Sequence, residues 1–105
     1  MDFSYADGVV AVAGGGQSAT PNISASTTRV TTVATTGDSL TLPSAAAGLR
    51  YIVINKGANS LNVFPLAGDQ INALSINAAF ALAATKSAEF IASNNVNWDT
   101  LPTVP

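Results

Sequence analysis

The chain has 105 residues, of which 48% are hydrophobic and only 10% are charged. This length allows one domain, and the hydrophobic fraction is high enough for a core, which excludes a wholly disordered chain. The net charge of -2 and the scattered positions of the four basic residues argue against nucleic acid as a partner, because phosphate binding needs clustered Lys and Arg. With no Cys and no His, disulfides, zinc-thiolate sites, thiol nucleophiles and histidine chemistry are excluded.

Residues 1–26 are predicted to form an extended N-terminal arm that ends in a Gly-rich linker. The arm carries five apolar side chains of interest: Phe3, Tyr5, Val9, Val10 and Val12. Residues 9–13 are expected to form a short strand, and the arm is expected to gain little by folding back on its own domain. Two interpretations follow, a strap across a neighbouring subunit and a disordered tail, and the two aromatic residues favour the strap.

The start of the chain also bears on location. It lacks the basic region of a signal peptide, and residues 9–13 are too short and too rich in small residues to span a bilayer. We therefore expect no membrane partner and synthesis in a cytoplasm.

The middle of the chain alternates between apolar and polar residues at the period of a strand. Residues 27–33 (TTRVTTV) have high β propensity but no strongly apolar face, which indicates an edge strand. Residues 39–42 alternate, with Leu40 and Leu42 predicted to point inward, and Pro43 ends this strand.

The densest β-branched and aromatic run lies in residues 48–65. Two apolar runs, residues 51–54 and 61–64, flank a loop that contains Gly and Asn, which predicts a β-hairpin. Both faces of residues 51–54 are apolar, which predicts a strand covered on two sides.

Further short strands are predicted at residues 70–74, 78–83, 88–92 and 97–101, separated by turns. This spacing favours a small antiparallel β-sandwich or barrel, jelly-roll-like, over residues 27–101, with a tail at 102–105. The Ala-rich stretch 78–92 is interpreted as two strands, because turn residues interrupt it and its apolar positions do not follow a helical period.

Residues 27–101 resemble a structural module of tailed-phage virion proteins. The resemblance depends on a pattern GxxYxVxNxGxxxLxVFPxxGDxIN, followed by a strand pair and a last strand that contains Trp. The matching positions here are Gly48, Tyr51, Val53, Asn55, Gly57, Leu61, Val63, Phe64, Pro65, Gly68, Asp69, Ile71, Asn72 and Trp98. Such modules occur in head decoration proteins and in tail or fibre proteins, and a chain that is almost all module favours a small capsid decoration (cement) protein.

The sequence offers little for catalysis. Gly14-Gly15-Gly16 lacks the Lys and the helix of a phosphate-binding loop, and nothing marks Asp69, Glu89 and Asp99 as paired carboxylates. Tyr51 and Trp98 could stack on a sugar, but their apolar strand contexts favour core or interface packing. We predict no enzyme activity, no cofactor and no metal site.

The leading hypothesis is a trimeric capsid decoration protein that binds the major capsid protein on the outer surface of the virion and stabilises the shell. Its predicted capsid contacts are the five arm residues. Its predicted subunit interface is formed by Tyr51, Val53, Phe64 and Trp98. The alternative is a tail or tail-fibre subunit, in the form of a carbohydrate-contacting adhesin.

Overall fold

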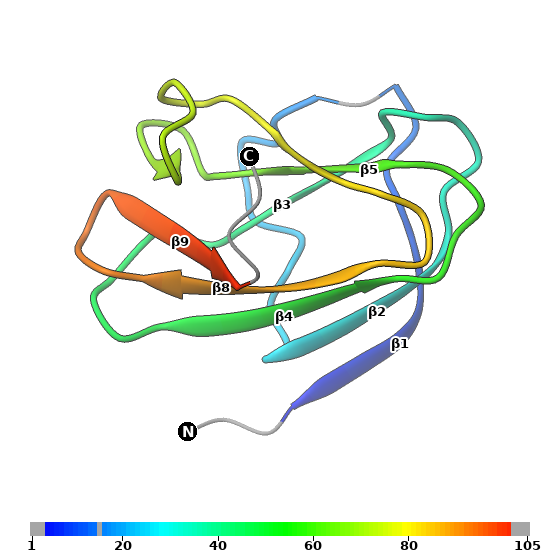
Figure 1. Cartoon of the computed structure of the whole chain (residues 1–105), viewed down its shortest axis with the longest axis horizontal. Coiled ribbons are helices and arrows are strands. Elements are labelled where there is room, and N and C mark those ends of the chain that lie inside the picture. Colours follow the sequence, from blue (N-terminus) through cyan, green and yellow to red (C-terminus); the bar gives the residue numbers. More distant parts are fainter. Residues whose placement is uncertain (1–3, 15, 102–105) are drawn as a thin grey trace.

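The computed structural model describes residues 4–14 and 16–101. Within these ranges the chain forms nine strands and no helix (Figure 1), which confirms the predicted all-β class. The strands are β1 (Tyr5–Val10), β2 (Thr27–Thr32), β3 (Ser39–Thr41), β4 (Arg50–Asn55), β5 (Leu61–Phe64), β6 (Gln70–Ile71), β7 (Phe80–Leu82), β8 (Ser87–Ala92) and β9 (Asn97–Leu101).

The strands form two sheets that lie in two layers (Figure 1). The larger sheet has the order β1-β2-β4-β8-β9-β6, and the smaller sheet has the order β3-β5-β7. Strands such as β5, β7 and β8 contribute alternate side chains to the core between the layers, whereas all three residues of β3 are buried. Phe80 of β7 and Phe90 of β8 meet edge to face across it, with ring centroids 5.5 Å apart. The largest fully buried side chains are Trp98, Phe80, Phe90, Ile23, Leu40, Leu42, Leu61, Ile71, Val30, Val53, Val63 and Asn55.

The predicted antiparallel, jelly-roll-like pairing is wrong. Of the seven strand pairs among the described residues, four are parallel: β1 with β2, β2 with β4, β3 with β5, and β6 with β9. The chain alternates between the layers from β2 to β5, so strands that are neighbours in a sheet are second neighbours in sequence. This winding resembles a short β-solenoid. The antiparallel pairs are those of β7 with β5, β8 with β4, and β9 with β8.

The predicted hairpin over residues 48–65 is also wrong. β4 belongs to the larger sheet, between β2 and β8, whereas β5 belongs to the smaller sheet, between β3 and β7. The loop between them therefore crosses from one layer to the other. Both strands themselves lie where the sequence predicts them, because local alternation determines where a strand forms but not which strand it pairs with.

The segment predicted as a free arm is part of the fold. β1 pairs with β2 in parallel register from Tyr5 opposite Thr27 to Val10 opposite Thr32, and Ala11 and Ile23 are buried in the core. The expectation that this segment gains little by folding back is therefore wrong. β2 is consequently an inner strand and not the predicted edge strand. Residues 1–3 of the predicted arm and the predicted tail at 102–105 lie outside the described residues.

The loop after β4 is fixed by a close contact at Gly57. A Cβ atom at Gly57 would lie 2.8 Å from the backbone nitrogen of Val33 and 2.9 Å from its Cγ2. We therefore expect Gly57→Ala to lower the free energy of unfolding by about 1–3 kcal/mol, because the backbone of Val33 must shift.

Denaturant unfolding measures this change, and Gly16→Ala is the matched control. A Cβ at Gly16 meets nothing within 4 Å, so its effect should stay within about 0.5 kcal/mol. Equal effects of the two substitutions would contradict the close approach of Gly57 to Val33.

Candidate binding surface

The larger sheet has one face in the core and one face turned away from the smaller sheet, which we call the outer face. On β4, Val53 points to the core and is fully buried, so its neighbours Ile52 and Ile54 point to the outer face. Both isoleucines are half-buried by their neighbours in the sheet, although no second layer lies over them among residues 4–14 and 16–101 (Figure 1).

The strand register shows which side chains share the outer face. Ile52 lies opposite Thr27 of β2 and Glu89 of β8, and Ile91 of β8 lies opposite Arg50 and Asp99. The face also includes two more exposed apolar side chains, Leu101, which pairs with Glu89, and Tyr5, which pairs with Thr27. The result is an apolar centre of three isoleucines with charged groups around it.

Two ion pairs lie on the outer face. Arg29 of β2 contacts Asp7 of β1 at 2.9 Å, and Arg50 of β4 contacts Glu89 of β8 at 2.9 Å. The hydrogen bond from Arg29 lowers the pKa of the Asp7 carboxyl, and the hydrogen bond to Glu89 raises the pKa of Arg50. These pairs are exposed to solvent and add little to stability, but they hold the long side chains in place beside the apolar centre.

One edge of this sheet is formed by β1, which carries three of the five residues predicted to contact a capsid, Tyr5, Val9 and Val10. Tyr5 is 56% exposed, Val10 is 60% exposed and Val12 is 47% exposed, whereas Val9 packs against the core. Phe3 lies outside the described residues. Backbone bonds hold this edge, including those from Thr27 N to Ser4 O at 3.1 Å and from Ala11 N to Thr32 O at 3.0 Å. The strand therefore presents large apolar side chains from a fixed position.

The four residues predicted to form a subunit interface do not lie on one surface. Val53 and Trp98 are fully buried in the core, so they offer no area to a second subunit. Tyr51 is partly buried and packs edge to face against Trp98, with ring centroids 5.9 Å apart. Phe64 is partly buried on β5, in the other sheet. Burial of Trp98 also means that its indole ring has no exposed face on which a sugar could stack.

The candidate carboxylates do not form a catalytic pair. Asp69 is buried, and its Oδ2 accepts a hydrogen bond from the backbone N–H of Ala45 at 2.9 Å. Glu89 is engaged by Arg50, and Asp99 is exposed on β9. Among the residues that the structure describes, no group of three acidic side chains is placed to hold a metal ion. The amide of Gly16 donates to Ser39 Oγ, so the glycine segment packs against β3.

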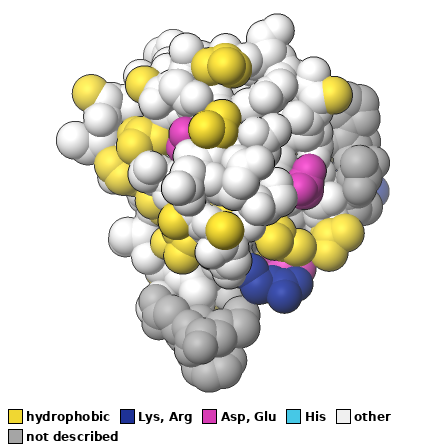
Figure 2. All heavy atoms as spheres, turned by 90° about the vertical axis from the view of Figure 1, so that its left-hand side faces the viewer, with side chains coloured by type: hydrophobic (Ala, Val, Ile, Leu, Met, Phe, Trp, Pro, Cys, Tyr) yellow, Lys and Arg dark blue, Asp and Glu magenta, His cyan; other side chains and the backbone are white. Residues whose placement is uncertain are grey.

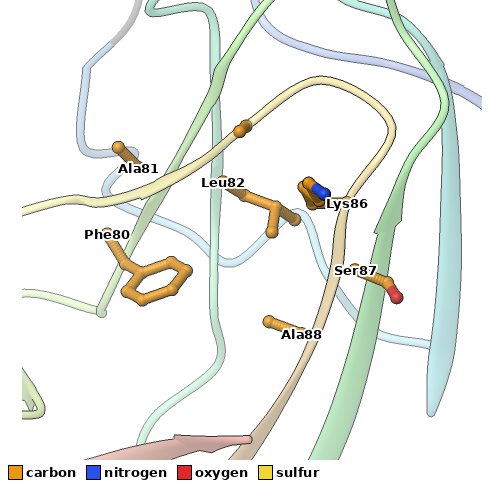
Figure 3. Close-up of a pocket in the computed structure, with 7 residues that line it drawn as sticks. Phe80, Ala81, Leu82, Lys86, Ser87 and Ala88 are labelled. Atoms are coloured by element: carbon orange, nitrogen blue, oxygen red, sulfur yellow. The ribbon is translucent and has the colours of Figure 1, made fainter. Parts of the chain in front are cut away.

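An apolar cavity of about 380 Å³ opens where β7 and β8 diverge into different sheets (Figure 3). Phe80, Leu82 and Ala88 point into it, whereas Ala81 points away. Lys86 and Ser87 also line the cavity and are exposed. The cavity offers packing volume for an apolar group, but its lining carries no acid, and Lys86 is its sole titratable side chain.

Charged groups are sparse over the side of the molecule in Figure 2, where basic atoms touch acidic atoms at the lower edge and hydrophobic atoms lie on either side. Over the described part of the chain, no helix is present that has the length and hydropathy to cross a membrane. No protein-family model matches the chain, and comparisons with curated proteins and with solved structures find no match either.

Reasoning from the sequence did not predict the two ion pairs or the position of Ile91 on the outer face. Ile52 and Ile54 had a signal, because both faces of residues 51–54 are apolar. The predicted interface included Tyr51 and Val53, which lie on the face of β4 that packs into the core.

Proposed function

We propose that this chain is a structural protein of a tailed-phage virion, a small capsid decoration protein that binds the outer surface of the shell and stabilises it. It acts by binding alone. Its partners are the major capsid protein and other copies of itself. The sequence pattern described above supports the phage assignment.

The observation that carries the proposal is the edge strand β1. Tyr5, Val10 and the adjoining Val12 expose roughly half or more of their surface, and burial of such side chains yields about 25 cal/mol per Å² of apolar area removed from water. If each copy bridges neighbouring capsid subunits, its separate contacts reinforce one another, so modest contacts of this kind are enough for binding.

Substitution of the exposed β1 side chains tests this proposal. We expect the triple variant Tyr5→Ser, Val10→Ser, Val12→Ser to fold, because these side chains contribute little to the core, and to lose at least about tenfold in capsid occupancy. Occupancy is measured as copies per virion by quantitative mass spectrometry. Point substitutions are preferred to deletion because β1 is an integral strand.

The matched control replaces two exposed apolar residues that lie outside the strands, Ile76→Ser and Val96→Ser, which are 56% and 40% exposed. This control should occupy the capsid fully. Full occupancy by the β1 variant would contradict the role of β1, and a few copies located at the tail would contradict the capsid assignment.

A further inference from the structure

We propose that Asp7 and Gly8 form a site of spontaneous covalent modification, at which Asp7 converts to isoaspartate and loosens the end of β1 from β2. The conversion uses only water and the chain itself. The inference does not rest on the proposed function, because its measurements are made on the isolated protein.

The backbone at this pair has room to change shape. Asp7-Gly8 is the one Asp-Gly pair of the sequence, and glycine has no side chain to obstruct a ring that closes on its nitrogen. The register of β1 with β2 passes from Ala6 to Val9 and skips both residues, as in a β-bulge. Gly8 has a φ of 69°, and a Cβ placed on it would meet nothing within 4 Å.

The reacting groups are also held together. Gly8 N donates a hydrogen bond to Asp7 Oδ1 at 2.7 Å, so the nitrogen that attacks lies beside the carboxyl group that it attacks. The Asp7 side chain is 54% exposed, so water reaches it. Groups held in such proximity react much faster than groups that must first find each other.

The other described aspartates lack this arrangement. At each of them the next amide nitrogen donates to an acceptor elsewhere in the fold, and these residues are Asp38, Asp69 and Asp99. Thr100 N, which follows Asp99, donates to Asn72 Oδ1 at 3.1 Å. Asp99 is also exposed, so it provides an internal control with similar access to water.

The reaction is balanced in two steps. The Gly8 nitrogen bonds to the Asp7 Cγ, and its proton leaves with one carboxyl oxygen as water, which gives a five-membered succinimide. Water then adds to the main-chain carbonyl carbon of Asp7 and breaks its bond to the Gly8 nitrogen, so that carbonyl becomes a free carboxylate. One water leaves and one enters, so the mass is unchanged, but the main chain now runs through the Asp7 side chain and is one carbon longer.

Arg29 slows the first step. It contacts Asp7 Oδ1 at 2.9 Å, and its hydrogen bond lowers the pKa of the Asp7 carboxyl. The neutral carboxyl group is the form that readily loses its oxygen as water, and it is therefore a minor species. The modification is consequently a slow one that accumulates with the age of the molecule.

The longer main chain changes the pairing beyond the bulge. Ala11 N donates to Thr32 O at 3.0 Å, and an added carbon at Asp7 displaces Ala11 along β2. We therefore expect this hydrogen bond to be lost, so that the end of β1 separates from β2.

Peptide mapping of the folded, full-length chain after prolonged incubation in neutral buffer tests the proposal. Isoaspartate, identified as a peptide of unchanged mass that resists a protease specific for aspartate, should form at Asp7 at least about tenfold faster than at Asp99. Asp7→Glu is the matched variant, since it keeps the charge but would have to close a larger ring, and it should accumulate none at this position. Thermal unfolding confirms that the variant is folded.

Hydrogen exchange supplies the second readout. The Ala11 amide should exchange at least about tenfold faster in the isoaspartate form than in fresh protein, because local opening then costs less. Equal rates of isomerisation at Asp7 and Asp99, or no isoaspartate at Asp7, would overturn the modification site. Unchanged exchange at Ala11 in the isoaspartate form would overturn the loosening of β1.

Discussion

Replacing Trp98 with alanine should lower the free energy of unfolding by about 3–5 kcal/mol, the range for removal of a large aromatic side chain from a core. Trp98 is fully buried on β9 and packs against Tyr51. For a small domain, whose total stability is about 5–15 kcal/mol, this loss is a large fraction, so the variant should unfold at a much lower denaturant concentration. Denaturant unfolding followed by circular dichroism measures the change.

Trp98→Phe is the companion variant. The indole Nε1 is buried and has no hydrogen-bond partner among the described residues, so phenylalanine removes an unsatisfied donor and should be tolerated far better than alanine. Because Trp98 is the one tryptophan of the sequence, its fluorescence reports its surroundings directly. Emission typical of water-exposed indole in the native protein, or a Trp98→Ala variant of unchanged stability, would show that Trp98 lies at a surface.

Replacing Asn55 with leucine should lower the free energy of unfolding by about 2–5 kcal/mol. Asn55 is fully buried at the end of β4. Its Nδ2 donates to the carbonyls of Asn59 and Leu82, each at 3.0 Å, and its Oδ1 accepts from the amide of Gly57 at 2.9 Å. Leucine preserves the volume but leaves these buried groups unpaired, and each unpaired group costs about 1–3 kcal/mol.

Asn94→Ala provides the control for Asn55. Asn94 also caps a turn, since its Oδ1 accepts from the amides of Val96 and Asn97 at 2.8 Å, but it is exposed. Water can replace its bonds, so we expect a loss of only about 1 kcal/mol. Thermal unfolding of both variants compares them, and a loss at Asn55 no larger than at Asn94 would mean that Asn55 acts as an ordinary turn residue.

The positions of most strands were predictable from the sequence, and their partners were not; the first strand, β1, spans Tyr5–Val10 and not the predicted residues 9–13. β4, β5 and β9 lie where alternation and turn residues indicate them, and the Ala-rich stretch forms β7 and β8 as two strands. Alternation is a property of neighbouring residues, whereas pairing depends on where each loop takes the chain. At the loop after β4, the buried side chain of Asn55 and the contact of Gly57 with Val33 take the chain to the other sheet. Those contacts join residues far apart in sequence.

The sequence indicates that both faces of residues 51–54 are covered, but not which of the two faces meets the core. Two apolar faces on residues 51–54 indicate that something covers Ile52 and Ile54 as well as Tyr51 and Val53. Which face meets the core depends on the position of the smaller sheet, which the local pattern does not contain. The pairing of Arg50 with Glu89, 39 residues apart, likewise follows from the register of β4 with β8.

The winding of the chain between the two sheets determines when the protein can fold during its synthesis. β4 pairs with β2 early but completes its pairing only when β8 has been made, and β6 and β8 both pair with β9. Trp98 therefore enters the core only after the eight preceding strands have been synthesised. Chains whose pairings join distant segments fold in milliseconds to seconds, more slowly than helical bundles. A nascent chain of this protein thus keeps apolar strands exposed until β9 emerges.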